Sequence, residues 1–108
     1  MANPRRRQHP GRDSLEYAAA LNELAALELR SGDAPAARQL YEHVLLLRRR
    51  GLGRDHALVG WSLSNLANAL ETEGDFVAAR IARQDCLAVR TRVLPRDHPD
   101  IARALKAL

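Results

Sequence analysis

The sequence predicts an all-α fold in which similar helix pairs are stacked along the chain as an α-solenoid. Three observations lead to this fold class. The 108-residue chain is rich in Ala, Leu, Arg and Glu, which favour helices, while aromatic residues make up only 4%. Apolar residues recur at spacings of three and four. The sequence also repeats itself with a period of about 42 residues, which is in the range of helical-pair repeats.

The repeat defines the expected domain organisation. Gly-Arg-Asp at 53–55 repeats Gly-Arg-Asp at 11–13, and the Gly-Asp pair at 74–75 repeats the pair at 32–33. Arg-Asp-His at 96–98 repeats 54–56 and opens a third copy. We therefore expect a flexible basic leader over 1–12 and a helical repeat domain over 13–108, with repeats at 13–54 and 55–96 and a partial repeat at 97–108.

The first unit contains two expected helices. Asp13 or Ser14 can cap the first, which should end near Arg30. Ser-Gly-Asp at 31–33 breaks it, because Gly tolerates the left-handed conformation and Asp can cap the next helix. The second helix, over 34–50, has Pro35 in its first turn and should run antiparallel to the first. The expected buried positions are Leu21, Leu24, Ala25 and Leu27, then Ala37, Leu40, Tyr41, Val44, Leu45 and Leu47.

The second unit follows the same plan after a loop at 51–54. Asp55 should repeat the capping role of Asp13, and Glu-Gly-Asp at 73–75 should separate the two helices. A third opening helix should begin after Asp97 and run to the end of the chain. The expected buried positions of the second unit are Leu63, Leu66, Ala67 and Leu70, then Phe76, Ala79, Cys86, Leu87 and Val89.

These features resemble tetratricopeptide repeats, and the period of about 42 residues, against the usual 34 or so, resembles the kinesin-light-chain subtype. The motifs that carry the resemblance are Leu-Gly-Arg-Asp-His at 52–56, Leu-Ser-Asn-Leu-Ala at 63–67, the Gly-Asp turns at 32 and 74, Ala-Arg at 79–80, Leu-Tyr-Glu at 40–42 and Pro-Arg-Asp-His-Pro-Asp at 95–100. The sequence departs from the family at Arg83, where an aromatic like Tyr41 is expected, and at Glu28, where a bulky apolar residue is expected.

The resemblance implies a right-handed superhelix whose first helices line a concave groove for an extended or helical peptide. The groove positions carried over to this chain are Asn22, Glu23, Ala26, Trp61, Ser64, Asn65, Asn68, Arg103 and Lys106. In relatives that hold acidic peptides, an Asn at the position of Asn65 and basic residues near Arg103 grip a carboxylate. Ala26 departs from that clamp, so a full carboxylate clamp is not expected.

Two groups of groove residues also stand out by their residue type. Trp61 either anchors a partner or packs against the neighbouring unit, and the sequence leaves both interpretations open. Asn65 and Asn68 share one helix face, and because Asn is a weak choice within a helix, a recognition role is favoured.

Catalysis, metals and cofactors are not expected. The sequence has no Gly-rich phosphate loop, nucleophile elbow or paired-Cys motif, and a single Cys86 excludes an intrachain disulfide. The Asp-His pairs at 55–56 and 97–98 recur at the repeat period before each first helix, so helix capping explains them better than metal binding or general base catalysis does.

The expected partner is a protein or peptide, with a preference for acidic ones. No apolar run is long enough to span a membrane, so the chain should be cytoplasmic. Nucleic-acid binding is the alternative, since the net charge is +4 and Arg triplets occupy 5–7 and 48–50, although the second triplet also suits a helix C-terminus. A second alternative is a fragment of a longer array, or a homo-oligomer formed through the helix at 99–108.

Overall fold

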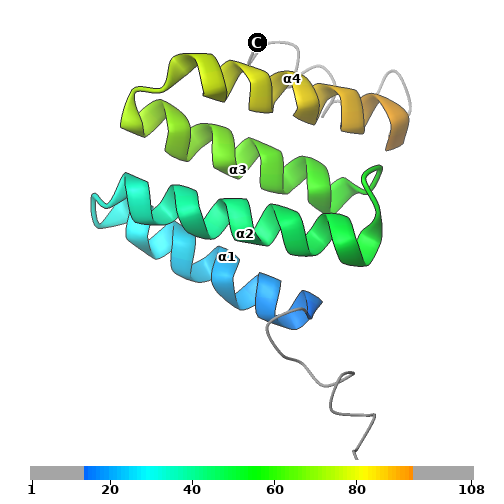
Figure 1. Cartoon of the computed structure of the whole chain (residues 1–108), viewed down its shortest axis with the longest axis horizontal. Coiled ribbons are helices and arrows are strands. Elements are labelled where there is room, and N and C mark those ends of the chain that lie inside the picture. The colour runs from blue at the N-terminus through cyan, green and yellow to red at the C-terminus, as the bar shows by residue number, and fades with distance from the viewer. Residues whose placement is uncertain (1–13, 94–108) are drawn as a thin grey trace, which may run out of the picture.

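The computed structural model describes residues 14–93, which form four antiparallel α-helices lying side by side in chain order (Figure 1). The helices are α1 (Leu15–Arg30), α2 (Ala34–Leu52), α3 (Ala57–Glu73) and α4 (Phe76–Val93). The first residues of α1 and α3 are 42 positions apart, as are those of α2 and α4. Within residues 14–93 there is no strand, so the all-α prediction is confirmed.

Capping residues and glycines set the ends of these helices, largely as predicted. The Ser14 hydroxyl accepts a 2.9 Å hydrogen bond from the Tyr17 amide at the start of α1. Asp33 accepts from the Ala36 amide at 3.0 Å at the start of α2. Gly32 and Gly74, in the turns between the two helices of each unit, have φ angles of 97° and 91°, which an L side chain rarely adopts.

The prediction that Asp55 caps α3 is wrong. The cap is His56, whose Nδ1 accepts a 3.0 Å hydrogen bond from the Leu58 amide. Asp55 instead accepts a 3.0 Å hydrogen bond from Nη1 of Arg92 in α4. His56 lies 42 residues after Ser14, so a ring nitrogen replaces a hydroxyl at the capping position of the second unit.

The predicted end of α2 is also wrong, by two residues. Gly51 and Leu52 continue the helix past Arg50, and the chain turns at Gly53, whose φ is 87°. A glycine within a helix weakens it but does not have to end it, whereas a residue with positive φ does. The expected loop at 51–54 is therefore reduced to its second half.

Most of the predicted core is buried. One cluster joins α2, α3 and α4, with Ala25 of α1, and a smaller one joins α1 to α2. The predicted positions that are buried are Leu21, Ala25, Ala37, Tyr41, Val44, Leu45, Leu47, Leu63, Leu66, Ala67, Leu70, Ala79, Cys86 and Val89. Leu40 and Leu87 are only partly buried.

Three predicted core residues are exposed instead. Leu24 and Leu27 are 43% and 55% exposed, because they lie on the face of α1 that corresponds to the α3 face packed against α2. No helix of the described chain precedes α1 to cover this face. Phe76 is 68% exposed, because it is the first residue of α4 and no described helix packs on that side.

Arg48 is buried, although it belongs to the arginine triplet at 48–50 that was expected to be exposed to solvent at the C-terminal end of α2. Its Nη1 donates a 2.9 Å hydrogen bond to the Ser62 hydroxyl, which in turn donates to the Leu58 carbonyl at 2.9 Å. Burial lowers the pKa of Arg48 from its usual value. Arg48 therefore links α2 to α3 and belongs to the interior.

None of the helices formed by residues 14–93 has both the length and the apolar character that crossing a membrane requires.

Candidate functional site

The first helices of the two units, α1 and α3, are joined by a contact between two predicted groove residues. Nδ2 of Asn65 donates a 3.2 Å hydrogen bond to Oδ1 of Asn22, and both side chains are partly exposed. Each amide retains donors, and Asn65 retains its acceptor, because one bond uses only part of the capacity of an asparagine. The structure thus brings these two residues together and leaves groups that can pair with a peptide backbone.

Trp61 lies one turn before Asn65 on α3 and is 50% exposed. The guanidinium carbon of Arg90, in α4, stands 4.6 Å from the centroid of the tryptophan ring. This is a cation–π contact within the second unit, and it holds the ring in one place. The contact is with the tryptophan's own unit and not with the neighbouring one, and half of the Trp61 residue stays exposed, as the anchoring of a partner requires.

Asn68 is engaged by Arg83, the residue that stands where the family pattern places an aromatic. Arg83 Nη2 donates to Oδ1 of Asn68 at 2.9 Å, and its Nε and Nη2 donate to the two carboxylate oxygens of Glu71 at 2.9 and 2.8 Å. The hydrogen bond from Arg83 lowers the pKa of Glu71, and the bond to Glu71 raises the pKa of Arg83.

Where Arg83 differs from the family pattern, the two residues that it contacts also differ in type from their equivalents in the first unit. In the first unit, the positions equivalent to Arg83, Asn68 and Glu71 carry Tyr41, Ala26 and Leu29. An apolar set has been replaced by a polar set whose members satisfy one another. Asn68 therefore accepts a hydrogen bond within its own unit and is also exposed on the face of α3.

Among residues 14–93, the other predicted groove positions form no side-chain hydrogen bond or ion pair between the two units. Glu23 is exposed on α1, Ser64 is partly exposed on α3 and Ala26 is partly buried. Arg103 and Lys106 lie outside the described residues. The polar stripe that the structure does describe is therefore formed by α1 and α3 alone.

The chemistry of this face is that of binding groups. Within residues 14–93, no cluster of three or more His, Cys, Asp or Glu side chains is placed to hold a metal ion. The Cys86 thiol is buried and donates to the Gly60 carbonyl at 3.2 Å. Burial raises the pKa of this thiol, so it is not a reactive thiolate.

Sequence reasoning missed a hollow surface on the other side of α3. Leu63, Leu66 and Leu70 line it, and on a helix of 3.6 residues per turn they lie opposite Trp61 and Asn65. The signal for it was weak in the sequence, because its walls come from α2 and α4, which are separated by a whole helix. The buried Arg48 had a stronger signal, since Arg90 recurs at the same place in the second unit.

Comparison with known proteins identifies the family. The family model of the tetratricopeptide repeat matches residues 16–92, which is more than two thirds of the chain. No curated protein matches the sequence. Tetratricopeptide repeats generally mediate protein–protein interaction and are generally scaffolds without enzymatic activity. The repeated helix pairs and the family match together place this chain in the tetratricopeptide repeat family.

Proposed function

We propose that the chain is a cytoplasmic interaction scaffold that holds a peptide segment of a partner protein on the concave face formed by α1 and α3. The observation that carries the proposal is the hydrogen bond between Asn22 and Asn65, which joins the first helices of both units into one polar stripe. Trp61 adjoins this stripe with half of its surface exposed. An accessible aromatic ring beside amide groups with unused hydrogen-bond donors and acceptors suits an extended peptide. The ring can cover an apolar side chain of the peptide, while the amides pair with the peptide backbone.

We further infer a preference for acidic peptides. The chain carries a net charge of +4, and Arg103 and Lys106 occupy groove positions by the repeat pattern. Exposed charge pairs are worth about 0.2–1 kcal/mol each, so the preference should be modest and sensitive to salt. The spacing of 42 residues between equivalent helices supports assignment to the kinesin-light-chain-like subtype.

Self-association is a second property that we propose. The exposed Leu24 and Leu27 occupy the face of α1 that in α3 packs against the preceding helix, and exposed apolar faces favour a partner. The predicted helix at 99–108 would expose Ala104 and Ala107 at the other end. Size-exclusion chromatography with light scattering tests this: a monomer at about 100 μM, unchanged by Leu105→Glu, would exclude self-association through that helix.

Nucleic-acid binding is less well supported. Arg48, the first member of the triplet at 48–50, is buried and bonded to Ser62, so it is not presented to a phosphate. Exposed aromatics also do not alternate with the remaining arginines, as stacking on bases requires.

A peptide array tests the proposed function directly. The wild-type chain should bind acidic peptides more tightly than basic ones, and Trp61→Ala with Asn65→Ala should weaken the binding. Phe76→Ala with Gln84→Ala is a matched control, because it removes an exposed aromatic and an exposed amide from α4. Equal or better binding of basic peptides would exclude the acidic preference, and equal binding by both double variants would exclude the concave face.

A further inference from the structure

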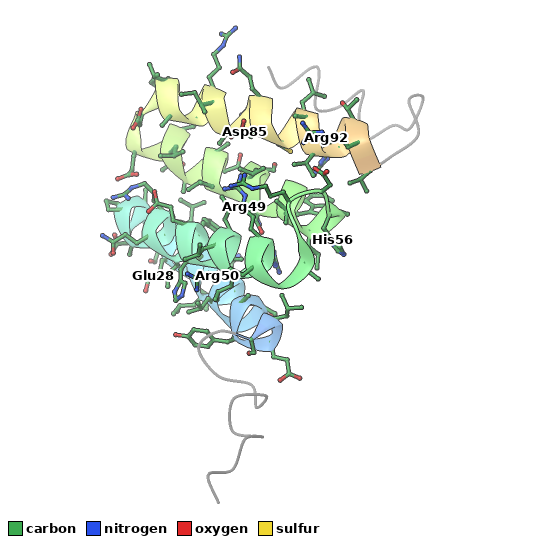
Figure 2. All side chains as sticks on the ribbon, turned by 45° about the vertical axis from the view of Figure 1, so that its right-hand side comes forward. Glu28, Arg49, Arg50, His56, Asp85 and Arg92 are labelled. Atoms are coloured by element: carbon green, nitrogen blue, oxygen red, sulfur yellow. The ribbon has the colours of Figure 1, made fainter. Side chains whose placement is uncertain are left out.

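A groove with a cavity volume of about 590 Å³ lies between α2 and α4, with α3 as its floor. We call it the outer groove, because it lies on the side of α3 opposite the proposed concave site. Figure 2 shows Arg49 and Asp85 on its two walls. Its volume lies within the range of about 300–1,000 Å³ that is usual for ligand pockets.

The floor of the outer groove is apolar. Leu63, Leu66 and Leu70 of α3 form it, and Ile81 stands on the α4 wall. Ile81 is 55% exposed, so its side chain can cover a group that enters the groove. A bulky apolar side chain would be buried there, with a gain of about 25 cal/mol for each Å² removed from water.

The α2 wall carries two arginines in different electrostatic situations. Arg38 is paired with Glu73 at 2.7 Å and with Glu42 at 3.3 Å. Arg49 has no ion pair within residues 14–93, and its Nε atom is buried without a hydrogen-bond partner. A buried donor without a partner is costly, and a carboxylate is the acceptor that a guanidinium binds best.

Further positive charge lies just beyond the groove, at the end where Arg49 stands. A smaller hollow shares Glu42, Leu45 and Arg49 with the outer groove and adds Arg50 and Arg54. Arg50 and Arg54 also form no ion pair with any other described residue. Arg49 in the outer groove therefore adjoins two further arginines without ion pairs. The acidic lining of the groove consists of Glu42 and Glu73, which pair with Arg38, and of Asp75 and Asp85.

We propose that the outer groove docks a short peptide segment of a partner protein, with a large apolar side chain over the leucine floor and adjoining acidic residues paired with Arg49, Arg50 and Arg54. Asp85 is compatible with an extended peptide, because the backbone amides of the peptide can donate hydrogen bonds to its carboxylate. This site is separate from the concave face, so its existence does not depend on the proposed function. The array would then hold two partners, or two segments of one partner, at the same time.

Fluorescence polarisation with short labelled peptides tests this site on the full chain. The probes contain Leu-Phe either preceded or followed by Asp-Asp-Glu, and the matched peptides carry three lysines in place of the acids. At about 50 mM salt, where ionic attraction is weakly screened, the acidic probes should bind and the lysine peptides should not. Arg49→Gln with Arg50→Gln should weaken binding by about tenfold. Ile81→Ser should weaken it by about fivefold.

Two control variants distinguish the outer groove from the rest of the protein surface. Arg80→Gln removes an exposed arginine of α4 that has no ion pair with the described residues, and it should leave binding unchanged. Trp61→Ala with Asn65→Ala leaves every residue of the outer groove in place, so the part of the binding that Ile81→Ser weakens should remain in this variant. Circular dichroism establishes that each variant is folded.

Several results would overturn the proposal. One is the absence of binding of any acidic probe to the wild-type chain, and another is binding that the Arg49 and Ile81 variants do not alter. Loss of binding only in the Trp61 and Asn65 variant would assign these peptides to the concave face and leave the proposed function intact. Tight binding of a labelled oligonucleotide, abolished by the Arg49 variant while the peptides fail to bind, would assign the arginines to nucleic acid.

Discussion

Replacing Ser62 by alanine tests the most buried polar contact between the two units. The Ser62 side chain is fully buried and accepts a hydrogen bond from Arg48, which is 9% exposed. A hydrogen bond to a charged group contributes about 1.5–3 kcal/mol, while alanine regains about 0.5 kcal/mol of helix propensity. The free energy of unfolding should therefore fall by about 1–2.5 kcal/mol.

The assay is urea unfolding followed by circular dichroism, with a thermal melt alongside. For a domain of this size, each 1 kcal/mol lowers Tm by about 4–8 °C. Ser64→Ala on the same helix is the matched control, because Ser64 is partly exposed and makes no hydrogen bond to a described residue. It should be neutral or slightly stabilising.

A double-mutant cycle sharpens the test. Arg48→Met should destabilise the fold, and Arg48→Met with Ser62→Ala should cost less than the sum of the single changes, because no buried donor is then left without its acceptor. If Ser62→Ala proves as stable as Ser64→Ala, the contact between Arg48 and Ser62 does not hold the two units together and the reasoning is refuted.

Three further predictions concern the turns, the Glu71 contact and Trp61. Gly32→Ala and Gly74→Ala should each lower the free energy of unfolding by about 1 kcal/mol. The cost comes from the backbone conformation alone, since an added Cβ meets nothing within 4 Å at either site. Thermal melts that do not change would contradict the positive φ angles. Glu71→Gln should lower Tm at pH 7, and because the folded pKa of Glu71 is lowered, the difference from wild type should shrink as pH falls below about 4.3; a difference independent of pH would argue against the Arg83 contact. Arg90→Ala should increase acrylamide quenching of Trp61, the single tryptophan, and equal quenching would show that Arg90 does not cover the ring.

The sequence was sufficient for the helical framework, because the signals for it are local. Ser14, Asp33 and Gly74 act within one turn of their positions, so capping and turn chemistry could be predicted from neighbouring residues. The 42-residue period then extended each local assignment to the next unit. His56 and Gly51 were misjudged because more than one residue type can cap or continue a helix at those positions.

The other misjudged residues depend on contacts that are distant in the chain. Leu24 has the apolar spacing of a core residue, and only the position of α1 at the end of the described stack makes it exposed. Arg48 is charged, and its burial depends on Ser62 in the next helix. For the site, the sequence placed Asn22 and Asn65 on one face, but their hydrogen bond and the stacking of Arg90 on Trp61 depend on how the helices pack.

The central claim is that partners bind the face formed by α1 and α3. Affinity capture from an extract of the source cell, quantified by mass spectrometry, tests it with the wild-type chain and two double variants. Proteins that bind this face should be retained by the wild-type chain and by Phe76→Ala with Gln84→Ala, and they should be lost from Trp61→Ala with Asn65→Ala. Retention of the same proteins in equal amounts by all three chains would contradict the claim.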